Sequence, residues 1–127
     1  MAIVPTDVPM TPELAGQTID ALREAYPFLR TERLATTAFG RGIDALTIGT
    51  GKRQVLYSAA HHANEWLTAT VLLKFAEDYA AAIQAGATLG GVDAAALAES
   101  ATIHMVPMVN PDGVALVTGT LEPGQEQ

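Results

Sequence analysis

The chain has 127 residues, and its 7 basic and 14 acidic side chains give a formal net charge of −7. This charge disfavours binding to nucleic acid or to anionic membranes, because both favour a basic protein surface that releases counterions. Hydrophobic residues make up 49% of the chain, enough to bury the core of one domain. The absence of cysteine excludes disulfides and thiolate metal sites, so His, Asp and Glu would have to hold any metal.

The N-terminal segment has neither the basic region nor the long apolar region of a secretory signal, and no apolar run is long enough to span a bilayer. We therefore expect a soluble, cytoplasmic protein. The first predicted element is a helix from Pro12 to about Ala25. Thr11 can cap the free amides of this helix, proline is tolerated at its first position, and Pro27 ends it.

Runs of β-prone residues follow this helix. Residues 34–39 and 43–48 flank Gly40-Arg41-Gly42, as two strands flank the turn of a hairpin. The apolar run of residues 54–60 lies between turn signals, which is typical of a strand covered on both faces within an α/β sheet.

The second half is predicted to contain two helices and a strand. Residues 65–85 place apolar side chains at helical spacing, and Gly86 can end this helix. A short helix over residues 93–100 and a buried strand over 102–109 come next. We interpret Asn110-Pro111-Asp112-Gly113 as a tight turn in which Asn and Asp bond their own backbone and the glycine takes a positive φ.

The order of helix, hairpin, strand, helix, helix and strand predicts the α/β class, with a mixed sheet and helices packed on its faces. Four strands are few for this class. We therefore expect that further elements of the fold follow the C-terminus of this sequence.

The candidate chemistry lies in residues 58–66, where a strand ends in a loop and the long helix begins. Side chains in such a loop are held by rigid elements on both sides and often line ligand sites. His62 leaves the loop and Glu65 lies in the first helical turn, so an imidazole nitrogen and a carboxylate can meet at one zinc ion. A structural interpretation stays open, because Glu65 also suits the helix dipole and Asn64 is an ordinary N-cap.

Besides this pair, the sequence has two further histidines and one tryptophan. Adjacent side chains on extended backbone point to opposite faces, so His61 cannot easily reach a metal held by His62. His104 lies in a predicted strand, where a histidine is more often a packed or surface residue than a ligand. Trp66 is predicted to pack in the core.

Several motifs occur in a particular order along the chain. His62-Ala63-Asn64-Glu65-Trp66 follows a strand and opens a long helix, and the last strand runs into VPMVNPDGV. Upstream, residues 38–43 and 48–49 look like an early strand pair. Together these motifs resemble the zinc carboxypeptidase family, and the resemblance covers nearly the whole chain.

The resemblance implies a hydrolase with a peptide substrate, in which two histidines and one glutamate hold zinc and leave a position open for water. His62 and Glu65 match two of these ligands. The third histidine, the glutamate base and the arginines of the family lie beyond Gly113, where this sequence has no His and no Arg. We therefore interpret residues 1–127 as the N-terminal part of one zinc carboxypeptidase-like domain, truncated within about residues 113–127.

Asn64 stands where the pancreatic enzymes have an arginine, which favours the bacterial branch that cleaves γ-D-glutamyl to diamino acid bonds in murein peptides. An N-acyl amino acid deacylase of the same superfamily is an alternative, since it shares the His-x-x-Glu motif. Another alternative is a non-catalytic fragment. We expect the chain alone to self-associate into a homo-oligomer through its uncovered apolar surface.

Overall fold

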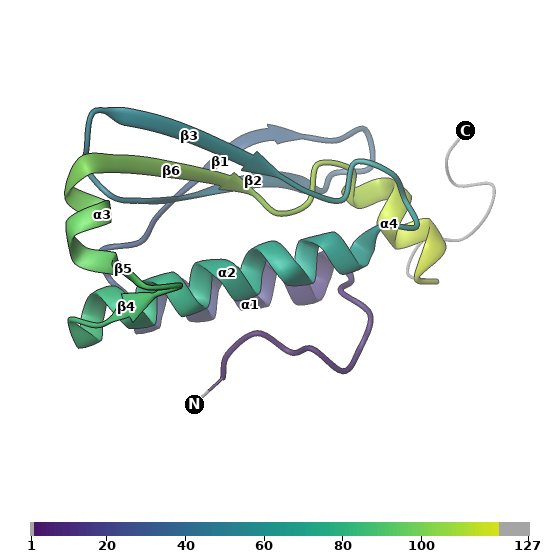
Figure 1. The fold of residues 1–127 in the computed structure, drawn as a ribbon. Coiled ribbons are helices and arrows are strands. Elements are labelled where there is room, and N and C mark those ends of the chain that lie inside the picture. The colour runs from purple at the N-terminus through teal and green to yellow at the C-terminus, as the bar shows by residue number, and fades with distance from the viewer. Residues whose placement is uncertain (1, 120–127) are drawn as a thin grey trace.

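A sheet and two long helices form the two layers of the computed structural model, which describes residues 2–119 (Figure 1). The mixed α/β class predicted from the sequence is confirmed. The helices are α1 (Pro12–Ala25), α2 (Trp66–Ala85), α3 (Ala94–Ser100) and α4 (Pro111–Val117). The strands are β1 (Arg30–Thr36), β2 (Gly42–Ile48), β3 (Arg53–Ser58), the short pair β4 (Thr88–Leu89) and β5 (Val92–Asp93), and β6 (Ala101–Val106).

The main sheet has the strand order β1-β2-β6-β3. The β1–β2 and β2–β6 pairs are antiparallel, whereas β3 pairs with β6 in parallel. The parallel register sets Ser58 opposite Val106, so β3 and β6 end at the same edge of the sheet. The loops that follow these two strands are thereby brought together.

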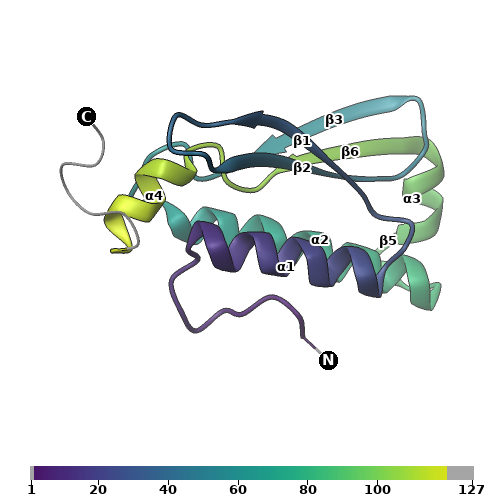
Figure 2. The same ribbon diagram turned by 180° about the vertical axis from the view of Figure 1, so that it is seen from behind.

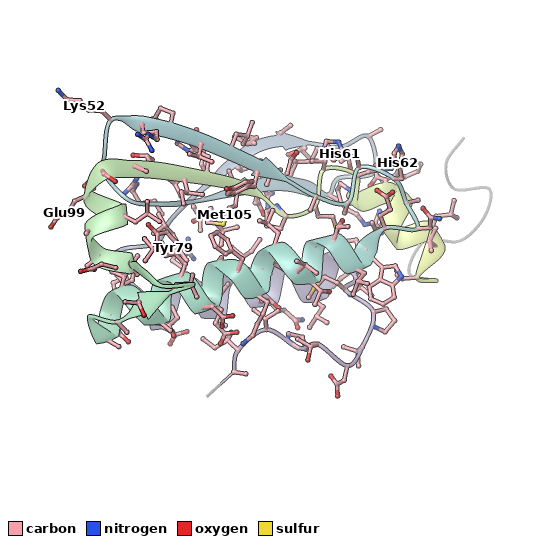
Figure 3. The ribbon with its side chains drawn as sticks, viewed as in Figure 1. Lys52, His61, His62, Tyr79, Glu99 and Met105 are labelled. Atoms are coloured by element: carbon pink, nitrogen blue, oxygen red, sulfur yellow. The ribbon has the colours of Figure 1, made fainter. Side chains whose placement is uncertain are left out.

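Both long helices lie against one face of this sheet, and Figure 2 shows α1 and α2 running side by side beneath it. Thr11 caps α1 as predicted, since its Oγ1 accepts a hydrogen bond from the Leu14 N–H at 3.1 Å. Tyr79 and Met105 point into the space between helices and sheet (Figure 3). The core between the layers includes five side chains with no exposed area: Leu22, Leu46, Leu73, Tyr79 and Met105.

The prediction that residues 54–60 are covered on both faces is wrong. β3 is an edge strand, and α1 and α2 cover only one face of the sheet. Leu56 is consequently 67% exposed and Tyr57 48% exposed. An apolar strand sequence indicates that burying the strand would be favourable. It does not show that residues 2–119 contain an element that covers both of its faces.

The interpretation of residues 110–113 as a tight turn is also wrong. Asn110 is the N-cap of α4, and its Oδ1 accepts a hydrogen bond from the Gly113 N–H at 3.0 Å. Gly113 does not take a positive φ. A Cβ there would lie 2.4 Å from Asn110 Nδ2 and 3.0 Å from the Cβ of Ala63, so a larger residue would displace the capping side chain. Asparagine followed by proline is a helix start as well as a turn signal.

A buried carboxylate ties the N-terminal segment to α2. Glu77 is only 3% exposed, and it accepts hydrogen bonds from the N–H groups of Ile3 and Val4 and from Lys74 Nζ. Burial raises the pKa of the Glu77 carboxyl, but the two backbone donors and Lys74 together outweigh it and lower the pKa overall. The ionised carboxylate therefore stabilises the fold.

Within residues 2–119, no helix is both long and apolar enough to cross a membrane.

Candidate metal centre

The loop between β3 and α2 is fixed along its first residues by the chain that follows β6. The N–H of Ala59 donates to the Val106 carbonyl at 3.0 Å. The carbonyls of Ala59 and Ala60 accept from the N–H groups of Val109 and Asn110, in both cases at 3.0 Å. Asn110 Nδ2 also donates to the carbonyl oxygen that precedes His62, at 3.3 Å. Four hydrogen bonds therefore hold the first residues of the loop against the end of β6 and the segment that leads into α4.

Ala60 turns the chain out of the strand direction. Its φ of +54° is left-handed, and no other non-glycine residue of the described part has a positive φ. Such a conformation is unfavourable for a residue with a Cβ and is retained only where surrounding contacts impose it. The turn directs the next residues toward the N-terminus of α2.

His62 and Glu65 are brought together at the end of this loop. His62 Nδ1 lies 3.1 Å from Glu65 Oε1, and the Glu65 N–H donates to the His62 carbonyl at 3.0 Å. Their side chains are 78% and 46% exposed. Glu65 is the N-cap of α2 and makes no side-chain capping bond, so Asn64 is not the cap. The carboxylate therefore makes no capping bond, although its place at the N-terminus of α2 still suits the helix dipole.

The spacing of the two side chains suits a zinc ion. Two ligand atoms that are each about 2.1 Å from zinc, at a tetrahedral angle, lie about 3.4 Å apart. The observed 3.1 Å between nitrogen and oxygen is close to this value, and it is also the length of a direct hydrogen bond or ion pair between the two groups. In residues 2–119, however, no group of three or more His, Cys, Asp or Glu side chains could hold a metal. The described residues thus bring together two side chains of ligand type, fewer than the three that a protein zinc site needs.

The other two histidines have different partners. His61 follows the same strand and lies near His62 in Figure 3, but its Nε2 is 2.8 Å from Ser58 Oγ. His104 lies on β6, where its Nδ1 is 3.1 Å from Thr47 Oγ1 and its Nε2 is 2.7 Å from Gln54 Oε1. The hydrogen-bond partners of both rings are thus residues other than His62 and Glu65. Trp66 packs partly buried against the core, as predicted.

Two features near the site were not found from the sequence. Thr68 makes two hydrogen bonds to the loop, although a threonine in the first turn of a helix gives no special signal. Asp112 accepts from Thr37 Oγ1 at 2.9 Å and from Arg41 Nη1 at 3.3 Å. These two hydrogen bonds attach the β1–β2 turn to α4. The N-cap of α4 is Asn110, which bonds the loop. Tertiary structure alone joins these segments.

The sequence pattern of the zinc carboxypeptidase family matches residues 16–124. The chain belongs to the zinc carboxypeptidase family. This assignment confirms the resemblance seen in the sequence and places the chain in a family of hydrolases.

Two curated relatives in this family agree with the assignment. The chain is 38% identical over 99 residues to γ-D-glutamyl-L-diamino acid endopeptidase 1 of Lysinibacillus sphaericus. It is 34% identical over 101 residues to the uncharacterized protein YqgT of Bacillus subtilis. Each alignment covers 78% of this chain but 25% and 27% of the relative. The chain therefore spans about a quarter of the length of these family members.

Solved carboxypeptidase structures show the same fold. A metallo-carboxypeptidase from Burkholderia cenocepacia superposes with a TM-score of 0.60 at 27% identity, over 80% of this chain and 27% of the other. Thrombin-activatable fibrinolysis inhibitor superposes with a TM-score of 0.69 at 17% identity, over 81% of this chain and 26% of that protein. The described residues thus have the architecture of one part of this family's domain.

Proposed function

We propose that this chain carries part of the active site of a zinc-dependent peptidase, with His62 and Glu65 as two of its metal ligands. The observation that carries the proposal is the 3.1 Å approach of His62 Nδ1 to Glu65 Oε1 in a member of the zinc carboxypeptidase family. A bound zinc ion would supply Lewis acidity toward a peptide carbonyl and would lower the pKa of a water molecule. The part of this chain is to hold the imidazole and the carboxylate at ligand spacing.

The proposal extends to the organisation of the domain. Residues 1–127 are the N-terminal part of a single zinc carboxypeptidase-like domain, and residues outside this sequence supply the third ligand, the base and the substrate-binding arginines. Two observations support this: the described residues contain no group of three metal-binding side chains, and the chain spans a quarter of its relatives. With two ligands, the chain alone would bind zinc weakly.

For the substrate we propose a γ-D-glutamyl to diamino acid bond of murein peptides. The support is Asn64 between the two ligands and the relative from Lysinibacillus sphaericus, which is named as an endopeptidase for such bonds. The competing alternative is an N-acyl amino acid substrate. A hydrolysis assay that offers both kinds of substrate would distinguish the two.

Calorimetric titration with zinc tests the ligand assignment. We expect the wild-type chain to bind zinc and the His62→Ala and Glu65→Ala variants to lose most of this binding. His61→Ala is the matched control, because this adjacent histidine bonds Ser58 and not the pair. A wild-type chain that binds no zinc, or an equal loss in all three variants, would contradict the proposal.

The uncovered surface supports a second proposal, that the chain alone self-associates. Exposed or partly exposed apolar side chains surround a groove of about 710 Å³ beside the outer face of α2. We define this open face by Tyr57, Leu67, Val71, Phe75 and Val92. Removing such a face from water is favourable. Sedimentation velocity over a range of concentrations tests this, and a particle that stays monomeric throughout would contradict it.

A further inference from the structure

The hydroxyl of Thr68 joins the two ends of the loop that carries His62. Its Oγ1 accepts a hydrogen bond from the Ala60 N–H at 2.8 Å and donates one to the Glu65 carbonyl at 2.7 Å. A hydroxyl has one proton to donate and lone pairs to accept, so Thr68 uses both capacities. Ala60 is the residue at which the chain turns away from β3, and Glu65 is the candidate ligand at the end of the loop.

The contact with Ala60 distinguishes this threonine from others in helices. Threonine hydroxyls often bond a carbonyl of the preceding turn, so the bond to Glu65 alone would have no special meaning. Ala60 is left-handed and only 1% exposed. Water is therefore a poor substitute for the Thr68 acceptor, and a buried N–H without a partner is unfavourable. The Thr68 hydroxyl thus stabilises an otherwise unfavourable backbone turn.

We propose that Thr68 is a positioning residue for the metal pair, which sets the loop shape that brings His62 Nδ1 to Glu65. Asn110 holds the same turn through its backbone and side-chain amides, which donate to the carbonyls of Ala60 and His61. His62 directly follows the two residues that Asn110 holds. The inference rests on the proposed function, because the pair needs this preorganised spacing in order to bind a metal.

Three variants of the 127-residue chain separate positioning from general helix stability. Thr68→Val keeps the shape of the side chain and removes the hydroxyl, whereas Thr68→Ser keeps the hydroxyl. Thr70→Val is the matched control on the same helix, since the Thr70 hydroxyl is buried and has no hydrogen-bond partner among the described residues. Thermal unfolding of each variant first checks that it folds.

Two measurements are made on the folded variants. Amide hydrogen exchange of Ala60, without metal, reports the loop itself, and zinc affinity in competition with a chelator reports the pair. We expect Thr68→Val to exchange Ala60 faster and to bind zinc about tenfold more weakly. Thr68→Ser and Thr70→Val should match the wild type in both measurements.

The outcomes divide clearly between the two proposals. Wild-type exchange or wild-type zinc affinity in Thr68→Val would overturn the positioning role, as would an equal effect of Thr70→Val. A wild-type chain that binds no zinc overturns the proposed function and the metal role of Thr68 with it. In that case the exchange rate of Ala60 still decides whether the Thr68 hydroxyl holds the loop.

Discussion

Two strands of one sheet differ sharply in cover, although both have apolar sequences. Leu46 on β2 is completely buried, while Leu56 on β3 is 67% exposed. β2 lies between β1 and β6, and its Leu46 pairs with the buried Met105. β3 is at the edge, and its Leu56 pairs with His104, whose side chain lies on the opposite face of the sheet from Met105. The comparison teaches that the energy of an apolar side chain depends on what covers it, which the side chain itself does not specify.

The candidate metal centre lies just beyond the end of β3. Its loop leaves this edge strand, but its hydrogen bonds come from helices, through Asn110 at the N-cap of α4 and Thr68 on α2. Substitutions on β3 should therefore disturb the geometry of the His62–Glu65 pair less than substitutions of Asn110 or Thr68.

Truncating the same residue type in the two strands should give the largest contrast. Leu46→Ala leaves a cavity in the core and should lower the free energy of unfolding by about 2 to 5 kcal/mol. Leu56→Ala removes an exposed side chain and should change it by less than about 0.5 kcal/mol. Urea denaturation at low protein concentration measures both. A large loss in Leu56→Ala would mean that another copy of the chain covers β3.

A substitution of Glu77 tests how the N-terminal segment is attached to α2. Glu77→Gln keeps the shape but removes the charge that Ile3, Val4 and Lys74 contact, and should cost about 1 to 3 kcal/mol at neutral pH.

The pH dependence gives a second reading of the same residue. Because the folded-state pKa of Glu77 is lowered, its contribution is present above the ordinary glutamate pKa and is lost as the pH falls through the lower value. The stability difference between wild type and Glu77→Gln should therefore shrink between about pH 5 and pH 3. A difference that stays constant over this range would exclude the ionised carboxylate as its source.

Substitutions of Asn110 test how the N-cap of α4 holds the loop. Asn110→Ala removes the cap of α4 and the bond to the His61 carbonyl, and should cost about 1 kcal/mol. Asn110→Asp keeps an acceptor for the Gly113 N–H but loses the donor. We expect Asn110→Asp to recover most of the stability that Asn110→Ala loses. We expect both variants to bind zinc more weakly than the wild type, as measured by chelator competition. Equal zinc affinity in both variants and the wild type would show that the His61 contact does not matter.

The smallest effect on stability is expected on the open face. Val71 is 62% exposed on α2, so Val71→Lys should change the free energy of unfolding by less than about 0.5 kcal/mol. It should nevertheless weaken self-association, because a charge would have to be buried against a second copy. Sedimentation velocity separates the two effects. Unchanged association in this variant would place the contact elsewhere.

Local signals in the sequence were sufficient for most elements. The N-cap Thr11 with Pro12, the helical spacing after Glu65 and the left-handed Gly86 each act over a few residues, and the structure confirms α1 and α2 at these places. β1 begins and ends earlier than predicted, because its exposed charged residues give no apolar pattern. Residues 110–113 start a helix and do not form the predicted turn, because helix caps and turns use the same residue types.

By itself the sequence determined the α/β class, the family and the loop that holds His62 and Glu65, since all three depend on short motifs in a fixed order. Tertiary structure decided that β3 is an uncovered edge, that Asn110 holds the loop, and that Asp112 contacts Arg41. The physical reason is that these contacts join residues far apart in the chain or depend on which surfaces are present to cover them. Local sequence patterns carry neither kind of information.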